Sequence, residues 1–296
     1  MISIIITSFK EPRTIGKAIE CFLNQDLKDK FELIVSTPDA ETIKVVEKYA
    51  KKDKRIRIFE DPGMGKGFAL NQLLFEITGE IIVLSDGDVF VKENTIQYII
   101  DKFKDPKVGC VTGNPRSINS RKNMLGYWSH LLVEGMHQFR LNRAKKGLFL
   151  ECSGYLWAFR NGVIKRFPVD IAEDTVVPYL FREKGYKIAY EPLAEVYVKF
   201  PTTLKDFINQ KKRTAKGHEA LAKYVNIKRL PRTKSLKNEI VEGTWKALSY
   251  PRNLIEMIYT LLLFPMRLYV WGLVFYHTKV KKEDYQDAWE RVESTK

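Results

Sequence analysis

The chain of 296 residues carries 50 lysines and arginines against 36 aspartates and glutamates, which is a formal net charge of +14. Its hydrophobic content of 45% supports a real core, in one large α/β domain or two smaller ones. A balance this basic favours anionic partners, namely nucleotide phosphates, acidic lipid surfaces or nucleic acid. Three scattered cysteines, Cys21, Cys110 and Cys152, argue against a disulfide framework or a zinc site and fit a reducing compartment.

Short apolar runs alternate with segments of helical spacing along the first 84 residues. We expect strands at 2–7, 31–36, 56–59 and 81–84, and helices at 14–24, 41–51 and 68–76. This alternation predicts an α/β fold of three layers (α/β/α) with a mostly parallel central sheet. The first residues are interpreted as a strand, because they lack the basic leader and long apolar core of a signal peptide.

Two aspartates follow the apolar strand at 81–84, in the order Ser85-Asp86-Gly87-Asp88. Open α/β sheets bind ligands at the carboxyl ends of their strands. Side chains alternate along an extended chain, so Asp86 and Asp88 point to the same side. A divalent cation that shares a phosphate-bearing ligand needs such an arrangement. The alternative is a polar turn that caps a helix starting near Glu93.

Two other nucleotide-binding loops are excluded by their spacing. The loop after the first strand contains no G-x-G-x-x-G, which argues against a dinucleotide-binding fold. The run G-M-G-K-G at 63–67 lacks the spacing and the trailing Ser or Thr of a Walker loop. Neither motif therefore explains a nucleotide site at this edge of the sheet.

Three blocks stand in order within the first 90 residues: I-S-I-I-I-T-S-F-K-E-P at 2–12, G-K-G-F-A-L-N at 65–71 and T-G-E-I-I-V-L-S-D-G-D at 78–88. Together they resemble the family 2 inverting glycosyltransferases, which have the GT-A nucleotide-sugar fold. The resemblance implies that Thr7 and Glu11 hold the base and ribose and that Lys66 lies near the nucleotide. It also implies that Asp86 lies near the ribose, and that Asp88, with Asp86 beside it, ligates Mg²⁺ or Mn²⁺ bridging the diphosphate.

The end of the second strand departs from the family pattern. The family usually has a pair of aspartates there, whereas this chain has Ser36-Thr37-Pro38-Asp39. The resemblance then implies that Asp39 takes over the contact with the base, and it leaves the identity of the base open. Simpler roles also remain possible for Glu11, as a charge at a helix N-terminus, and for Lys66, as a solvated lysine.

A second acidic motif, A-E-D-T at 172–175, precedes L-F-R-E-K-G-Y-K-I-A-Y-E-P at 180–192. This segment resembles the family's block around its catalytic base. It implies that Asp174 takes the proton of the acceptor hydroxyl, and that Glu173 orients Asp174 or binds the acceptor. Ser153 and Gly154 match a small-residue turn that lines the donor sugar and acceptor. The structural alternatives are a helix cap and a tight turn between strands.

A third motif, D-F-I-N-Q-K-K-R-T-A-K-G at 206–217, resembles the Q-x-x-R-W block of membrane polysaccharide synthases. Gln210 and Arg213 match it and are implied to complete the donor site, because the planar arginine fork suits diphosphate oxygens. Thr214 stands where tryptophan is usual, so the aromatic platform for a sugar ring is missing. The alternative is a basic, solvated helix.

The region 124–143 is amphipathic and rich in aromatic residues, which predicts a helix. His130 and His137 are seven residues apart and could share a face of that helix. Because no third ligand accompanies them, we interpret both as ordinary helix residues rather than as a metal site.

The apolar segment 254–277 is long enough to cross a bilayer but contains Glu256, Pro265 and Arg267. A central arginine is costly in a spanning helix, and Pro265 divides the segment into two pieces that are each too short to span. Both flanks are basic, so both ends prefer the cytoplasm. We therefore expect a broken interfacial or re-entrant helix pair in the inner leaflet. The alternative is a packed core helix or an oligomer interface.

Two further features of the last quarter fit a membrane surface. Four aromatic residues would sit at headgroup depth, and a basic run would attract anionic lipid. The aromatic residues are Tyr259, Tyr269, Trp271 and Tyr276, and the basic ones are Lys228, Arg229, Arg232, Lys234 and Lys237. The tail at 285–296 resembles the tail that follows the membrane segments of polysaccharide synthases.

The sequence thus predicts a metal-dependent, inverting glycosyltransferase at the cytoplasmic face of the cell membrane. Its donor is a UDP- or GDP-sugar and its acceptor a lipid-linked or glycan hydroxyl, with no nucleic-acid partner. We expect a GT-A catalytic domain at 1–225, divided into a nucleotide-sugar-binding half (1–115) and an acceptor half (116–225). A helical membrane-association region follows at 226–296. The alternatives are a nucleotidyltransferase that uses the strand-end aspartates and a metal, and a basic nucleic-acid or lipid-binding module.

Overall fold

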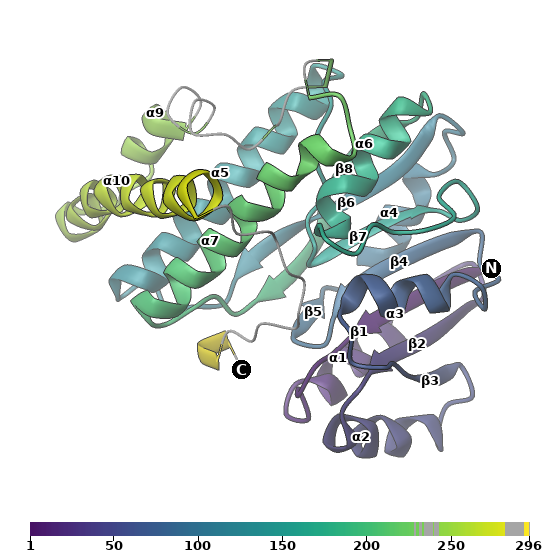
Figure 1. Ribbon diagram of the computed structural model, residues 1–296. Coiled ribbons are helices and arrows are strands. Elements are labelled where there is room, and N and C mark those ends of the chain that lie inside the picture. Colours follow the sequence, from purple (N-terminus) through teal and green to yellow (C-terminus); the bar gives the residue numbers. More distant parts are fainter. Residues whose placement is uncertain (228, 231–232, 234–238, 240–242, 282–292, 296) are drawn as a thin grey trace.

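One eight-stranded sheet forms the centre of the computed structural model, which describes residues 1–227, 229–230, 233, 239, 243–281 and 293–295 (Figure 1). The strands lie in the order β3-β2-β1-β4-β7-β6-β8-β5. Their bounds are β1 Ile2–Thr7, β2 Phe31–Thr37, β3 Ile56–Glu60, β4 Ile81–Asp86, β5 Val89–Val91, β6 Val108–Ser117, β7 Leu156–Arg160 and β8 Lys187–Val198.

Helices pack on both faces of this sheet, and a further group, α5, α7, α9 and α10, gathers beyond it (Figure 1). Their bounds are α1 Ile15–Leu23, α2 Ala40–Ala50, α3 Lys66–Leu73, α4 Thr95–Lys102, α5 Met124–Lys145, α6 Glu173–Glu183, α7 Leu204–Ala220, α9 Thr244–Leu248 and α10 Leu254–Phe275. A π-helical turn, Tyr276–Val280, continues α10. The predicted α/β class and its layers are confirmed.

The parallel arrangement predicted for the first 86 residues is also confirmed, because β1 pairs in parallel with β2 and β4, and β2 with β3. The second half differs. Strand β7 is antiparallel to β4 and β6, and β5 is antiparallel to β8, while β6 and β8 are parallel. The sheet is therefore mixed. Strand β8 was not predicted, since Glu191, Pro192 and Glu195 interrupt its apolar alternation.

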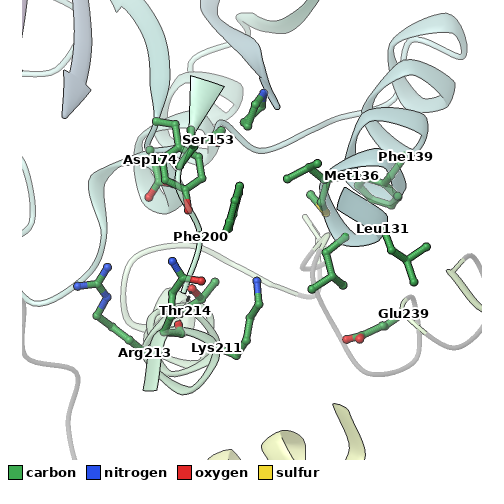
Figure 2. A pocket seen from close by; sticks show the side chains of 18 of the residues that line it. Leu131, Met136, Phe139, Ser153, Asp174, Phe200, Lys211, Arg213, Thr214 and Glu239 are labelled. Carbon is green, nitrogen blue, oxygen red and sulfur yellow. Dashed lines mark hydrogen bonds between the residues drawn. The ribbon is translucent and has the colours of Figure 1, made fainter. Parts of the chain in front are cut away.

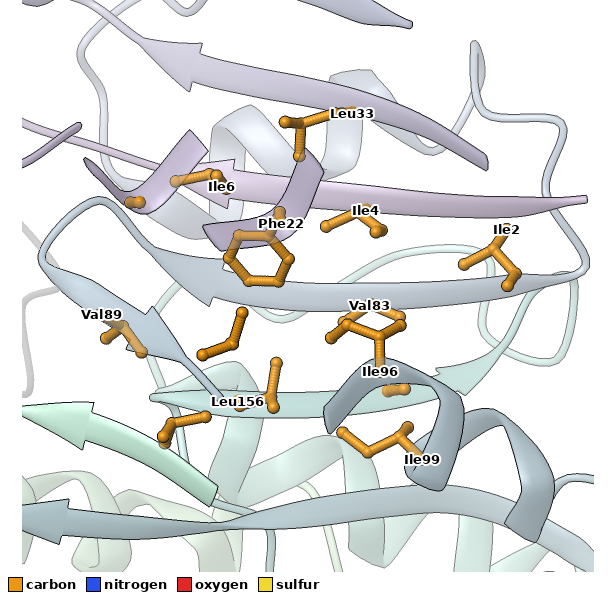
Figure 3. Close-up of a cluster of buried hydrophobic side chains, with 14 of the residues drawn as sticks. Ile2, Ile4, Ile6, Phe22, Leu33, Val83, Val89, Ile96, Ile99 and Leu156 are labelled. Atoms are coloured by element: carbon orange, nitrogen blue, oxygen red, sulfur yellow. The ribbon is translucent and has the colours of Figure 1, made fainter. Parts of the chain in front are cut away.

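Alternate residues of the central strands enter two separate cores. Ile4 and Ile6 of β1 pack on one face with Phe22 of α1 and Ile96 of α4 (Figure 3). Ile5 packs on the other face, with residues of α3 and α6. Each buried large side chain contributes roughly 1.5–3 kcal/mol. The two cores therefore hold the carboxyl ends of β1 and β4 in fixed positions, and these ends carry the predicted site.

Helix α10 is fastened to α5 by polar contacts as well as by packing. The hydroxyl groups of Tyr127 and Thr260 lie 2.6 Å apart, and Trp128 Nε1 donates to the Tyr259 carbonyl at 2.6 Å. Trp128 also packs in a buried cluster with Phe207 of α7 and with α10. These three helices therefore form one unit beside the sheet.

The prediction that Pro265 breaks the apolar segment is wrong, because α10 runs through it as one 22-residue helix. A proline in a helix removes one backbone hydrogen bond and costs about 3 kcal/mol. Contacts on both sides of Pro265 offset this cost. Thr260 is bonded to α5 on one side, and on the other Arg267 and Trp271 donate to Glu239 at 2.8 and 2.9 Å.

Within the described part of the chain, the segment Leu254–Thr278 is the one helix that is long and apolar enough to cross a membrane. Only 22% of its apolar window is buried, which differs from the core helix considered as an alternative. Tyr269 and Tyr276 are exposed, whereas Tyr259 and Trp271 are half-buried. Lys228, Arg232, Lys234, Lys237 and residues 285–292 of the tail lie outside the described residues.

Candidate active site

A cavity of about 1060 Å³ lies at the carboxyl ends of β1 and β4 and extends between α5, α6, α7 and α10. Ligand pockets usually measure roughly 300–1,000 Å³, so this cavity is at the upper end of that range. It brings together all but one of the predicted site residues. Those that line it are Thr7, Glu11, Lys66, Asp86, Asp88, Ser153, Gly154, Glu173, Asp174, Gln210 and Arg213.

Asp86 is the last residue of β4 and lies beside Thr7 in the parallel register of β1. Thr7 Oγ1 donates to Asp86 Oδ1 at 3.0 Å, which fixes the carboxylate at the strand end. The next residue must be glycine, because a Cβ at Gly87 would lie 2.4 Å from Glu11 Oε2 and 2.5 Å from Ser8 Oγ. The loop after β1 therefore packs directly on the turn between the two aspartates.

Lys66 joins the two acidic motifs, which are far apart in the sequence. Its Nζ lies 2.9 Å from Asp86 Oδ1 and 2.8 Å from Glu173 Oε1. Burial alone lowers the pKa of Lys66, but the two carboxylates raise it by more. Gly65, whose φ of 109° favours glycine, precedes Lys66 at the start of α3. The G-M-G-K-G run thus positions a buried cation rather than a phosphate loop.

The Asp86 and Asp88 carboxylates form the best candidate for a metal site. Burial, and then the neighbouring charge of Asp86, raise the pKa of Asp88 to about 7. Two hard oxygen donors held close together fit Mg²⁺ or Mn²⁺. No group of three or more His, Cys, Asp or Glu suited to a metal occurs among the residues that the structure describes. An ion here would therefore need further ligands from a bound substrate and water.

Asp174 lies in the first turn of α6, against the turn that carries Ser153 and Gly154. A Cβ at Gly154 would stand 3.2 Å from Asp174 Oδ2, so glycine leaves room for that carboxylate. Ser153 N donates to Thr112 Oγ1 at 2.9 Å, which ties the turn to β6. Figure 2 shows Asp174 and Ser153 together on one side of the cavity. Helix α6 therefore contributes a further carboxylate to the cavity.

Helix α7 forms another wall and presents Gln210 and Arg213 to the cavity (Figure 2). The Oε1 atom of Gln210 is buried and has no hydrogen-bond partner within the described residues. Buried polar atoms are rarely unsatisfied, which makes this atom a candidate contact for a bound ligand. The charge of Arg213 acts on Asp88, whose pKa it lowers against the stronger effect of burial. Arg213 and the aspartates thus belong to one electrostatic site.

Comparison with known proteins decides the family. A model of the family described as "Glycosyltransferase like family 2" matches residues 1–217. The chain belongs to this family. The poly-beta-1,6-N-acetyl-D-glucosamine synthase of Staphylococcus aureus (strain COL) is 27% identical over 256 residues, and that of Staphylococcus epidermidis is 25% identical. The alignment covers 82% of this chain, which spans 62% of the length of these relatives.

Solved structures share the fold. The mannosyltransferase PcManGT from Pyrobaculum calidifontis, in complex with GDP-Man and Mn²⁺, matches with a TM-score of 0.60 and 20% identity over 95% of this chain and 81% of its own. S. aureus TarS 1–349 in complex with UDP-GlcNAc matches with a TM-score of 0.50 and 16% identity, over 95% of this chain and 92% of its own. At these identities the likeness shows the GT-A-like fold alone.

One predicted site residue of this family 2 glycosyltransferase does not line the cavity. Asp39 is the N-cap of α2 and accepts hydrogen bonds from Thr42 N at 2.9 Å, Lys10 N at 2.6 Å and Thr37 Oγ1 at 3.0 Å. Burial raises the pKa of Asp39, but these hydrogen bonds lower it by more. Asp39 therefore fixes the loop after β1 and begins a helix, instead of reaching into the cavity.

The glycosyltransferase also contains a buried pair that is absent from the predicted site. His218 Nε2 and Glu151 Oε2 lie 2.8 Å apart, and both residues are 3% exposed. Glu151 also accepts from the Tyr179 hydroxyl at 2.8 Å. Residues 151 and 218 are too distant in sequence for their pairing to be predicted. The available signal is Glu151 itself, because a carboxylate in the apolar run 148–152 needs a buried partner.

His130 and His137 of α5 have separate partners. His130 Nε2 lies 2.7 Å from the Asn119 carbonyl oxygen, and His137 Nδ1 lies 2.6 Å from the Tyr190 hydroxyl. Each histidine thus has a structural contact of its own, in agreement with their interpretation as helix residues.

Proposed function

We propose that this family 2 glycosyltransferase is metal-dependent and inverting, and that it moves a sugar from a UDP- or GDP-sugar to a hydroxyl of a lipid-linked or glycan acceptor. The observation that carries the proposal is the convergence of Asp86, Asp88 and Asp174 on one cavity, with Lys66 between the two motifs. Family membership favours glycosyl transfer over the nucleotidyltransferase and the binding module considered above.

Five residues would form the part of the donor site that holds the metal and the diphosphate. Asp88 and Asp86 would hold Mg²⁺ or Mn²⁺, which, when bound, neutralises charge on the leaving diphosphate. Arg213 would bind diphosphate oxygens, and Gln210 would accept a hydrogen bond from the donor through its unpaired Oε1. Lys66 would keep Asp86 ionised and in place. The mannosyltransferase with GDP-Man and Mn²⁺ supports a donor and a metal of these classes.

The loop after β1 would hold the base and ribose. Thr7 and Glu11 line the cavity beside Asp86, and Ser8 Oγ donates to Glu11 Oε2 at 2.8 Å. Because Asp39 lies outside the cavity, base recognition would rest on this loop. The base of the donor would be uracil or guanine.

Asp174 would act as the general base of a single displacement. The acceptor oxygen attacks the anomeric carbon while the bond from that carbon to the diphosphate oxygen breaks, and the hydroxyl proton passes to the Asp174 carboxylate. One displacement inverts the anomeric configuration. Glu173, paired with Lys66, would hold the start of α6 and therefore orient Asp174. Ser153 and Gly154 would line the sugar and the acceptor.

We further propose that α10 attaches the enzyme to the cytoplasmic face of the cell membrane through residues 254–277. The exposed apolar face of α10 would lie in the interface, with anionic lipid drawn to the basic chain. Arg267 and Glu256, which oppose insertion, pair with Glu239 and Arg121 of the protein itself. The poly-N-acetylglucosamine synthases named above support a glycan product.

The test measures transfer from radiolabelled UDP- and GDP-sugars with Mn²⁺, before and after EDTA. We expect release of a nucleoside diphosphate, an inverted anomeric centre by NMR, and loss of turnover with EDTA. Asp174→Asn should lower kcat by about 100-fold or more, whereas the surface control Asp101→Asn should not. Release of pyrophosphate, or full activity of Asp174→Asn, would contradict the proposal.

A further inference from the structure

Arg140 is a buried cation on the wall of the cavity. It lies on α5, lines the cavity and is 4% exposed. Its Nε is buried without a hydrogen-bond partner within the described residues. Burial lowers the pKa of Arg140, and the carboxylates of Asp174 and Glu151 oppose this effect only in part. A guanidinium placed in this way fits an anionic ligand, because burying a charge is costly until it is paired and hydrogen-bonded.

Apolar side chains line the cavity from the same helix as Arg140. Leu131, Met136 and Phe139 line the same wall from α5 (Figure 2). Leu263 and Phe264 of α10 also line the cavity. Figure 2 places the three α5 residues across the cavity from Asp174 and Ser153. The cavity therefore has a polar half, which suits the nucleotide-sugar, and a more apolar half between α5 and α10, which Arg140, Arg267 and Glu239 also line.

Helix α10 connects this apolar half to the outer surface. One face of α10 lines the cavity with Leu263 and Phe264, while Ile258, Leu261 and Leu262 are exposed. A hydrocarbon chain could therefore pass from a lipid layer into the cavity along one helix. A soluble glycan has no hydrocarbon chain to bury along this apolar face, so the face would not increase its affinity.

Resting on the function proposed above, we infer that Arg140 binds the phosphate of an acceptor whose sugar is linked through that phosphate to a hydrocarbon chain. The chain lies along the apolar wall of α5 and α10, and the sugar hydroxyl lies near Asp174. The hydroxyl oxygen forms the new glycosidic bond, its proton goes to Asp174, and the nucleoside diphosphate leaves. The phosphate of the acceptor is held and does not react.

Four synthetic acceptors with the same sugar separate the two contributions. A dodecyl phosphosugar is compared with a methyl phosphosugar, a dodecyl glycoside and a methyl glycoside, for glucose, mannose and N-acetylglucosamine. We expect the KM of the dodecyl phosphosugar to be at least about tenfold below that of either partial analogue, since charge-assisted hydrogen bonds and buried alkyl area each contribute that much. Equal KM values for all four compounds would overturn the inference.

Two variants test the two contacts, each with a matched control. Arg140→Gln should abolish the preference for acceptors with a phosphate and keep the preference for acceptors with a dodecyl tail. Arg140→Lys should restore part of the preference for the phosphate. Phe139→Gln should weaken the preference for the dodecyl tail and keep the preference for the phosphate. The controls are Lys145→Gln, an exposed cation of α5, and Phe75→Gln, an exposed phenylalanine that does not line the cavity. Neither control should change either preference.

The donor provides the discriminating readout. If Arg140→Gln raises the KM of the nucleotide-sugar instead, Arg140 belongs to the donor site and the inference is wrong. If no nucleotide-sugar is turned over or bound, the proposed function fails. Calorimetric binding of the dodecyl and methyl phosphosugars to the full chain then tests the acceptor site separately. If binding depends neither on the dodecyl tail nor on Arg140, the proposed acceptor site is wrong even without a result on the donor.

Discussion

The imidazole of His218, which lines the cavity, and the carboxylate of Glu151 lie 2.8 Å apart, and they connect three elements that carry the site. His218 Nδ1 lies 2.8 Å from the Thr214 carbonyl oxygen, which only accepts, so Nδ1 carries a proton. Tyr179, on the same helix as Asp174, donates to Glu151. The pair thus fixes α7, with its Gln210 and Arg213, against α6.

Glu151→Gln and His218→Gln should each loosen the attachment of α7 to α6. We expect a loss of stability of about 1–3 kcal/mol and a 10- to 100-fold lower kcat/KM, because small displacements of a site are costly to the rate. Urea unfolding and steady-state kinetics measure the two effects. The double variant should cost less than the sum of the singles; strict additivity would show that the two groups do not interact.

Lys66→Met should leave the buried Glu173 and the half-buried Asp86 without their shared cation. Removal of one partner from a buried ion pair typically costs about 3–5 kcal/mol, and urea unfolding measures it. The control is Lys104→Met, which removes an exposed pair with Asp101 and should cost at most about 1 kcal/mol. Equal costs for the two variants would show that the Lys66 bridge is not buried in solution.

Gly87→Ala should disturb the turn between the two aspartates, because its Cβ would clash with Glu11 and Ser8. We expect a loss of about 1–3 kcal/mol from overpacking, together with weaker nucleotide-sugar binding in a thermal-shift titration with Mn²⁺. Gly272→Ala in α10, where a Cβ meets nothing within 4 Å, should instead stabilise by about 0.5–1 kcal/mol. An unaffected donor affinity in Gly87→Ala would contradict the packing of the Ser8–Glu11 loop on this turn.

Acid should weaken the attachment of α10. Hydrogen bonds from Arg121 lower the pKa of Glu256 below its ordinary 4.5, against the effect of burial. A lowered carboxyl pKa contributes stability that is present above pH 4.5 and is lost as the pH falls through the pKa of the folded state. The stability difference between wild type and Glu256→Gln, from urea unfolding at pH 3 to 7, should therefore shrink below pH 4.5. A difference that is constant with pH would rule out an ionised Glu256 in the contact.

Local patterns predicted the first half of the fold well, because each strand and helix there is short, apolar on one face and bounded by turn residues. They predicted less where pairing is non-local. The three-residue strand β5 carries too little periodicity, and Pro265 suggested a break that side-chain contacts with α5 and Glu239 prevent.

The site shows the same division between local and non-local information. Asp86 and Asp88 follow from the position of a strand end, and Asp174 from a resemblance. The Lys66 bridge, the Glu151–His218 pair and the burial of Arg140 depend on residues brought together by folding. Asp39 shows the opposite case, since an acidic residue after a strand became a helix cap.

Trp128, whose indole is bonded to the backbone of α10, has a consequence for how the chain can be divided. Truncation after residue 225 would expose the buried side chains of Tyr127 and Trp128 and open the α10 side of the cavity to solvent. Residues 1–225 and helix α10 therefore depend on each other for folding. A variant truncated before Leu254 should aggregate and show no activity.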